Sequence, residues 1–196
     1  YSIDTLSKKN VNKLELQKEL GLEVNPDIPM LTMVSRMTDQ KGLNYLLPAI
    51  KELAGHKVQI VIAGTGDPMY VDQLEYLSKI YSGSIHFYHG FSERIAHVYM
   101  AAGDFFLMPS LFEPCGLTQM YALSYGTLPI VRNVGGLKDT VVDITNKEAT
   151  GVVFNKPEAE DLVSAVRKGL LNYHECRDTF SNVQHRAMST KFLWSD

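Results

Sequence analysis

The feature that most constrains the fold is a regular alternation of short apolar runs with longer amphipathic stretches. Strand-like runs lie at 30–35, 58–64, 85–90, 102–110, 128–132 and, more weakly, 150–154. Helices are expected at 12–22, 42–54, 68–81, 92–101, 116–125, 136–143 and 157–171, with a helical tail to about residue 186. Because strands that alternate with helices pair in parallel, the pattern predicts an α/β domain whose helices cover both faces of a mostly parallel sheet.

Composition and charge narrow the class of protein. A chain of 196 residues is expected to form one domain with an ample core. It contains no apolar run of about 18 residues, so no membrane span is expected. The net charge of −3 comes without a concentrated Lys/Arg face, which argues against nucleic acid as a partner.

The two cysteines, Cys115 and Cys176, are too few for a secreted disulfide framework and indicate a reducing, intracellular compartment. The first residues lack the basic flank and apolar stretch of a signal peptide. Because the sequence does not begin with Met, we expect a fragment or a processed product. Near the other end, Phe192 and Trp194 are expected to pack against protein, such as a further part of the molecule.

The loops that follow the strands are the expected place for a ligand, because open α/β sheets bind ligands outside the carboxyl ends of their strands. All of these loops are rich in glycine, charge or aromatic residues. They are SRMTDQKG (35–42), AGTGDP (63–68), HGFSE (89–93), PSLFEPCG (109–116) and RNVGG (132–136).

The first two loops suggest an anionic ligand but do not require one. Arg36 and Lys41 flank a turn, and two cations at a strand end suit a diphosphate; both can equally be solvated loop cations. Gly64 and Gly66 allow close backbone approach to a phosphate or sugar, or else form a tight strand-to-helix turn. The dinucleotide fingerprint needs a third glycine where Met69 stands, which disfavours a nicotinamide-binding domain.

The third loop offers an aromatic side chain at a strand end. Phe91 can stack on a nucleotide base or can cap the core. His86 and His89 point to opposite faces of a strand, and neither has a cysteine or acid at ligand spacing, so no metal site is expected.

The fourth loop combines a carboxylate with a helix start. Gly116, Leu117 and Thr118 supply the first free amides of that helix, and these suit a phosphate. Glu113 precedes them and is expected beside the phosphate, where it can accept hydrogen bonds from sugar hydroxyls; a plain solvated acid is the alternative. Cys115 is either a small residue at this site or a packed thiol.

No other catalytic pattern stands out in the sequence. It holds no Ser-His-Asp set, no HExxH and no P-loop. Nor does it offer Glu113 a second carboxylate for a glycosidase pair. The nearest candidate, Asp104, lies in the preceding strand, where we expect a structural role.

Five segments of the sequence look familiar together: SRMTDQKGLNYLLPAI, AGTGDP, FEPCGLTQMYALSYGTLPIVR, NVGGLKDTV and the entry helix NKLELQKELGL. They resemble the carboxy-terminal half of the bacterial glycogen synthase and plant starch synthase family. The similarity spans nearly the whole chain. The resemblance implies a Rossmann-like parallel sheet that forms one half of a two-domain GT-B-type glycosyltransferase. Residues 1–196 would be the carboxy-terminal donor-binding domain, and the amino-terminal acceptor-side domain would be absent.

The same resemblance implies an activity and partners. Glucose would pass from ADP-glucose, or UDP-glucose, to the non-reducing end of an α-1,4-glucan with retention at the anomeric carbon. No metal or other cofactor is implied, and the expected compartment is the bacterial cytoplasm or the plastid stroma. Neither a membrane nor a nucleic acid is an expected partner.

The resemblance also implies roles for individual residues. The basic residues of the first loop match the pair on the donor diphosphate, and Glu113 matches the acid near the donor glucose. The amides of Leu117 and Thr118 match those that hold phosphate, and Phe91 matches the aromatic beside the base. Many related transferases carry a second glutamate on the ribose where this chain has Tyr121, which is either a ribose contact or a core tyrosine.

The sequence therefore predicts the donor domain of a nucleotide-sugar-dependent glucosyltransferase, with the isolated fragment expected to be inactive. A non-catalytic sugar-nucleotide or glucan-binding module is the main alternative. A sugar-nucleotide epimerase or another retaining transferase of the same architecture is a third. Nothing at Phe91 selects ADP-glucose over UDP-glucose, since stacking tolerates both bases.

Overall fold

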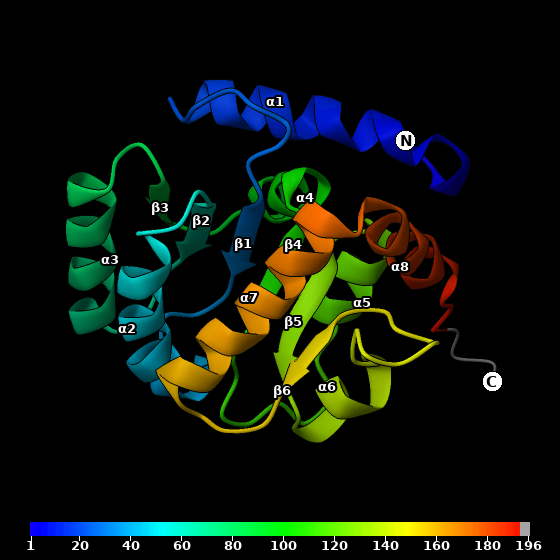
Figure 1. Ribbon diagram of the computed structural model, residues 1–196. Coiled ribbons are helices and arrows are strands. Elements are labelled where there is room, and N and C mark those ends of the chain that lie inside the picture. Colours follow the sequence, from blue (N-terminus) through cyan, green and yellow to red (C-terminus); the bar gives the residue numbers. More distant parts are fainter. Residues whose placement is uncertain (193–196) are drawn as a thin grey trace.

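The computed structural model describes residues 1–192 and contains a six-stranded sheet with the strand order β3-β2-β1-β4-β5-β6 (Figure 1). All neighbouring strands pair in parallel, which confirms the predicted parallel sheet. The strands are β1 (Met30–Val34), β2 (Gln59–Gly64), β3 (Ile85–His89), β4 (Phe105–Met108), β5 (Leu128–Arg132) and β6 (Val152–Phe154).

Helices connect the strands in the expected alternation. The two short 3-10 helices are η1 (Ile3–Lys8) and η2 (Asp39–Lys41). The α-helices are α1 (Lys9–Glu19), α2 (Leu43–Leu53), α3 (Pro68–Ile80), α4 (Glu93–Ala102), α5 (Thr118–Ser124), α6 (Gly135–Thr140), α7 (Ala159–Glu175) and α8 (Arg177–Ser189).

One hydrophobic cluster lies on each face of the sheet, because successive residues of a strand point to opposite faces. Leu31 and Met33 of β1 pack with α2, α3 and α7 on one face. Met30 and Val34 of the same strand pack with α1, α4 and α6 on the other. Helices thus cover both faces, as the alternating sequence predicts.

Element boundaries differ from the expectations where backbone chemistry overrides the apolar pattern. The strand expected at 102–110 shortens to β4, because Ala102 ends α4 and Pro109 has no N–H for the ladder. The helix expected from residue 116 begins at Thr118, because Gly116 adopts a left-handed φ of 72°. The tail divides into two helices at Cys176.

The amino-terminal helix begins earlier than expected and ends where a glycine stops it. The expected span was 12–22, whereas α1 starts at Lys9. Gly21 follows the helix with φ 68°, and the Leu22 N–H donates to the Gln17 carbonyl at 2.8 Å, so Gly21 acts as the predicted helix stop.

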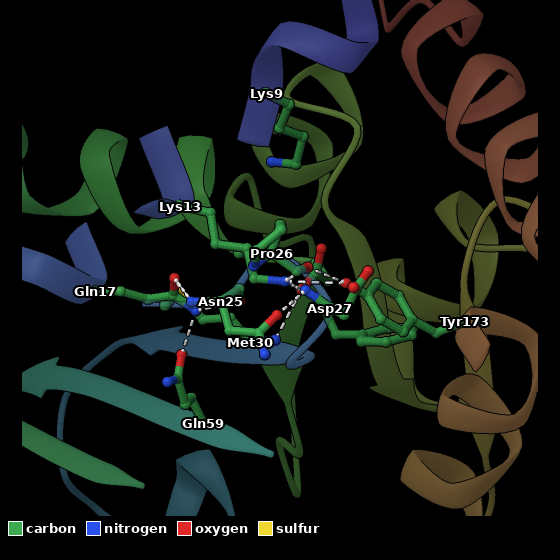
Figure 2. Close-up of polar contacts among 12 residues, drawn as sticks. Lys9, Lys13, Gln17, Asn25, Pro26, Asp27, Met30, Gln59 and Tyr173 are labelled. Carbon is green, nitrogen blue, oxygen red and sulfur yellow. Dashed lines mark hydrogen bonds and ion pairs between the residues drawn. The ribbon is translucent and has the colours of Figure 1, made fainter. Parts of the chain in front are cut away.

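Helix α1 lies across the amino ends of the strands (Figure 1) and is attached there by buried polar groups (Figure 2). Lys13 Nζ lies 2.6 Å from Asp104 Oδ2 and donates to the Tyr173 hydroxyl at 3.0 Å. Asp104 Oδ2 also accepts the Met30 N–H at 2.7 Å, which confirms the structural role expected for this carboxylate. One turn earlier, Lys9 Nζ donates to two backbone carbonyls of α4 and to Thr127 Oγ1.

The last residues complete the described part of the chain. Phe192 keeps 38% of its surface exposed, and its expected packing against a further part of the molecule stays a prediction. Trp194 lies outside the described residues, 1–192. Over those residues, no helix combines the length and the apolar character needed to cross a membrane.

Candidate functional site

The loops after the strands meet at the carboxyl edge of the sheet and are joined to one another through their backbones. The Met37 N–H donates to the Thr65 carbonyl at 2.9 Å, which joins the first loop to the second. The Leu111 N–H donates to the Gln40 carbonyl at 2.9 Å, which joins the fourth loop to the first. The convergence inferred from a parallel sheet is therefore present as a connected surface.

Glu113 and Lys41 form an ion pair at the centre of this edge. Their side chains are 11% and 18% exposed, so the pair is largely shielded but reachable by a ligand. Ser110 Oγ donates to the same carboxylate oxygen, Oε2, at 3.2 Å. Within residues 1–192, Glu113 Oε1 has no hydrogen-bond partner. The alternative of a solvated loop acid is wrong, because Glu113 is buried and paired.

The backbone under Glu113 is held by glycines whose role the sequence left unassigned. A Cβ atom on Gly135, which has φ 45°, would lie 1.8 Å from the Glu113 carbonyl oxygen. A Cβ atom on Gly136 would lie 2.1 Å from the Cys115 carbonyl oxygen. The Gly136 N–H instead donates to the Glu113 carbonyl at 3.1 Å. The paired glycines of NVGG therefore allow the start of α6 to support the loop of the acid.

Arg132 provides a second support that sequence reasoning missed. Its Nε donates to the Ser110 carbonyl at 2.9 Å, and its guanidinium also contacts the Leu111 carbonyl. A cation that binds backbone carbonyls fixes the loop without needing a ligand. Its position as the last residue of an otherwise apolar strand was the available signal.

Arg36 and Lys41 do not point at one partner. Lys41 is directed to Glu113, whereas Arg36 is exposed and its Nη2 donates to Gln40 Oε1 at 3.0 Å. Gln40 in turn donates from Nε2 to the Phe112 carbonyl at 3.2 Å. Both cations thus belong to the joined first and fourth loops. Convergence of both on one diphosphate stays a prediction.

The first loop is fixed to α3 by a tyrosine. The Tyr70 hydroxyl contacts Asp39 Oδ1, and this hydrogen bond to a carboxylate raises the pKa of Tyr70 to about 12. Asp39 opens the short helix η2 that ends at Lys41. Tyr70 therefore helps to position the turn that presents the lysine.

Gly64 and Gly66 are explained by contact between loops. A Cβ atom on Gly64 would lie 2.0 Å from the Ser35 carbonyl oxygen, and one on Gly66 would lie 2.4 Å from the Met37 carbonyl oxygen. Asp67 closes the turn by accepting the Met69 N–H at 2.9 Å as the cap of α3. This geometry favours the interpretation of the second loop as a tight strand-to-helix turn. Contact of a ligand with Gly64 or Gly66 stays a prediction that the geometry does not support.

A cavity of about 350 Å³ at the same end of the strands brings together three of the residues that the sequence singled out. These are Phe91, Thr118 and Tyr121. The two aromatic residues are 69% and 50% exposed, so the interpretations of Phe91 as a core cap and of Tyr121 as a core tyrosine are wrong. The other lining residues are Val34, Glu93, Ala96, His97 and Met100.

The predicted phosphate-binding amides lie at the start of a helix shorter than expected. Helix α5 has seven residues, and Leu117 precedes it without a side-chain cap. Gln119, fully buried, donates from Nε2 to the Cys115 and Gly116 carbonyls at 3.1 and 2.9 Å, which fixes the turn before the helix. Cys115 itself is exposed, so the packed-thiol interpretation is wrong.

Among the described residues, no group of three or more His, Cys, Asp or Glu side chains is arranged to hold a metal ion. This edge of the sheet offers charges, hydrogen-bonding groups and aromatic surfaces. These can neutralise an anion, bind hydroxyl groups and stack on a flat ring.

The fold is that of a Rossmann-like domain, and the loops at the carboxyl ends of its strands form the candidate ligand site. Residues 15–186 match the family described as glycosyl transferases group 1, and the chain belongs to this family. It is one Rossmann-like domain of the GT-B glycosyltransferase type.

Curated relatives agree with the resemblance seen in the sequence. The glycogen synthase of Aeromonas hydrophila is 50% identical over 198 residues, which cover 100% of this chain and 40% of that protein. The glycogen synthase of Desulfitobacterium hafniense is 40% identical over 193 residues, covering 97% and 41%. The chain thus spans about 40% of the length of the curated relatives it matches.

Solved structures give the same result. The catalytic domain of starch synthase IV from Arabidopsis thaliana, bound to ADP and acarbose, superposes with a TM-score of 0.93 at 29% identity, covering 100% of this chain and 41% of that chain. Anabaena HepE in complex with UDP and glucose has a TM-score of 0.72 at 18% identity, covering 96% and 49%, and shares the fold. The predicted resemblance to glycogen and starch synthases is confirmed.

Proposed function

We propose that this domain binds the sugar-nucleotide donor of a retaining glucosyltransferase of the glycogen and starch synthase type. Glucose would pass from ADP-glucose, or UDP-glucose, to the non-reducing end of an α-1,4-glucan. The observation that carries the proposal is that the shielded Lys41–Glu113 pair and a cavity lined by Phe91 and Tyr121 both lie at the carboxyl ends of the strands, where this family of folds binds ligands.

The first element of the mechanism is stabilisation of the leaving group. Cleavage of the bond between C1 and oxygen places negative charge on the diphosphate. Lys41, Arg36 and the backbone amides of Leu117 and Thr118 are the groups that would neutralise this charge without a metal. Positive groups held in place before the reaction stabilise such charge most effectively, and Lys41 is held by Glu113.

Glu113 is better suited to bind the sugar than to attack it. Its Oε2 is already shared between Lys41 and Ser110, and this pairing makes the carboxylate a weaker nucleophile. Oε1 is available to accept hydrogen bonds from glucose hydroxyls, and the negative charge favours a cationic sugar ring. The transfer we favour therefore occurs on the front face, with the leaving phosphate helping to deprotonate the acceptor hydroxyl.

The cavity would hold the nucleoside. Phe91 is exposed at its edge and offers a ring for base stacking, worth about 1–3 kcal/mol per base in nucleic-acid complexes. Stacking accepts adenine or uracil, so this side chain alone does not choose between ADP-glucose and UDP-glucose. The compartment implied by the resemblance, cytoplasm or plastid stroma, stays a prediction.

The acceptor side of the reaction is assigned to a second domain. The chain spans about 40% of the length of its curated relatives, so the complete enzyme is proposed to include an amino-terminal domain that binds the glucan. The same observation favours a second function for the 196-residue chain taken alone, which is binding of the sugar nucleotide or the glucan without transfer.

One pair of experiments separates these functions. Calorimetry measures binding of ADP, ADP-glucose, UDP-glucose and a maltooligosaccharide to the chain. In parallel, the chain replaces its matching segment in the Aeromonas hydrophila glycogen synthase, and glucosyl transfer by this chimera is compared with that of the unmodified enzyme. We expect donor binding by the chain and transfer only by the chimera.

The outcomes are distinct. Donor binding with a folded but inactive chimera would favour the binding module. No binding of any donor, together with an inactive folded chimera, would overturn the donor-domain assignment. Competition between ADP-glucose and UDP-glucose in the active chimera would then identify the donor.

A further inference from the structure

Four residues of α4 line the cavity, and two of them are polar side chains with no role assigned so far. Glu93, on the first turn, and His97, one turn later, line the cavity together with apolar Ala96 and Met100. The side chain of His97 is 46% exposed, so it is not required to fill the core. A polar pair on an otherwise apolar wall suggests a ligand-recognition role.

His97 is held in one orientation by α5. Its Nδ1 lies 3.0 Å from the hydroxyl of Tyr125, the residue that follows α5. Its other ring nitrogen, Nε2, lies 3.8 Å from Glu93 Oε1. When the tyrosine hydroxyl donates to Nδ1, Nε2 carries the proton and becomes a hydrogen-bond donor. Nε2–H and the Glu93 carboxylate then form a neighbouring donor and acceptor.

Glu93 and His97 line the same cavity as the residues proposed for the two ends of the nucleotide, its base and its phosphate. Phe91, proposed for the base, and Thr118, proposed for the phosphate, line the same cavity as Glu93 and His97. The pentose lies between base and phosphate in every nucleotide, so it has to pass these walls. A carboxylate accepts from hydroxyl groups, and an imidazole N–H donates to a hydroxyl oxygen.

We propose that His97 and Glu93 bind the hydroxyl groups of the donor's pentose and make the site selective for ribonucleotides over deoxyribonucleotides. Tyr125 is a positioning residue that acts through His97. The inference rests on the proposed function, because it requires a nucleotide in the cavity. It adds the residues that read the sugar of the nucleotide itself, rather than the glucose that is transferred.

The test compares matched ligands that differ by one hydroxyl. Calorimetry on the 196-residue chain measures the dissociation constants of ADP, 2′-deoxy-ADP and 3′-deoxy-ADP. A hydrogen bond to a charged group is worth about 10-fold to 100-fold in affinity, so the native chain should bind ADP at least about 10-fold more tightly than one deoxy analogue. The variants are His97→Ala, Glu93→Gln and Tyr125→Phe.

In His97→Ala and Glu93→Gln, ADP should bind more weakly and the preference for ADP should shrink to less than about 3-fold, because the group that senses the hydroxyl is gone. Tyr125→Phe should also shrink the preference, which a purely structural role would not do. His185→Ala is the matched control, because this exposed histidine lies on α8, near the amino edge; its preference should equal that of the native chain. Thermal melts confirm that each variant is folded.

Three results would overturn the inference. If folded His97→Ala and Glu93→Gln both keep the full preference for ADP, the pair does not contact the pentose, while the donor-domain proposal stands. If the native chain binds ADP and both deoxy analogues equally, the cavity does not read the pentose at all. If the chain binds none of the three nucleotides, the inference falls, and the donor-domain assignment falls with it only if the folded chimera is also inactive.

Discussion

The amino ends and the carboxyl ends of the strands, called here the amino edge and the carboxyl edge of the sheet, each have an ion pair between a lysine and a carboxylate. The two pairs differ in their exposure to solvent. At the amino edge, Lys13 and Asp104 lie 2.6 Å apart with side chains 1% and 8% exposed. At the carboxyl edge, Lys41 and Glu113 are in contact with side chains 18% and 11% exposed. The first lysine is sealed from solvent, whereas the second remains within reach of a ligand.

The two lysines also differ in how many hydrogen-bond acceptors the protein provides, and the more buried lysine has more of them. Lys13 Nζ has three protein acceptors, namely Asp104, the Tyr173 hydroxyl and the Pro26 carbonyl (Figure 2). Lys41 has Glu113 alone among the described residues. A charge whose donors are all used by the protein stabilises the fold, and one with donors to spare can bind a substrate. The comparison therefore separates a structural lysine from a functional one by their remaining hydrogen-bonding capacity.

The largest expected effect is on stability at the amino edge. Lys13→Met leaves Asp104 buried without its cation, so the free energy of unfolding should fall by about 3–5 kcal/mol. Urea denaturation followed by circular dichroism measures this change. The double variant Lys13→Met/Asp104→Asn should recover part of the loss, since the amide is neutral and can still accept the Met30 N–H.

An exposed pair supplies the control for this prediction. Lys57 and Glu23 lie 3.9 Å apart with side chains 71% and 58% exposed. Lys57→Met should change the free energy of unfolding by less than about 0.5 kcal/mol. Equal losses for Lys13→Met and Lys57→Met would contradict the idea that burial makes the amino-edge pair structural.

The next effect is on turnover at the carboxyl edge. Lys41→Ala and Arg36→Ala should each lower kcat of the active chimera by about 10²-fold to 10³-fold, because each removes a cation that stabilises the leaving diphosphate. Thermal melts should change little for exposed Arg36. Lys57→Ala serves as the control for loss of a lysine away from the site. Unchanged turnover in both folded variants would end the phosphate assignment.

A smaller and more selective effect is expected for Glu113→Gln. The variant keeps the shape but loses the charge, so affinity for ADP-glucose should fall by about 10-fold as the bonds to glucose weaken. ADP should bind at least as tightly as before, because Lys41 is released from its partner. Calorimetry with both ligands checks the split. A parallel loss for ADP and ADP-glucose would show that Glu113 acts on the nucleotide and not on the sugar.

The sheet could be predicted from the sequence, whereas the buried contacts of Lys13 at the amino ends of the strands could not, for a physical reason. Each strand is visible in the sequence as a local apolar run, and the parallel pairing of the strands follows from the helices between them. Lys13, however, reads as a polar residue on the surface of a helix. Its partners, Asp104 and Tyr173, lie 91 and 160 residues away along the chain. A periodic pattern carries no information about such distant partners.

The site was predicted at the level of loops and only partly at the level of side chains. Parallel strands bring their following loops together, so Lys41 and Glu113 were both expected at one edge. Their direct pairing across 72 residues was not, and neither were the contacts of Arg132 with the loop of the acid. Arg36 and Lys41 look equivalent in the sequence, yet only Lys41 is held at the acid.

The smallest expected effect is a pH dependence of stability that comes from Lys9, the other buried lysine of α1. Burial, opposed by the charge of Asp104, lowers the pKa of Lys9 to about 7. Between about pH 7 and the unfolded pKa, the unfolded chain binds more protons than the folded chain, so the contribution of Lys9 to stability rises with pH. From pH 7 to pH 8, the gain should be about 1 kcal/mol.

Urea denaturation at a series of pH values measures this gain as the difference between the native chain and Lys9→Met, which has no titrating group at this position. The control is the exposed Lys57→Met, whose difference from the native chain should be flat over the same range. A flat difference for Lys9→Met as well would mean that the ammonium stays charged, held by the Met100 and Ala101 carbonyls and Thr127. Both buried lysines of α1, Lys9 and Lys13, would then be permanently charged structural anchors, and the two ends of the sheet would differ only in their exposure.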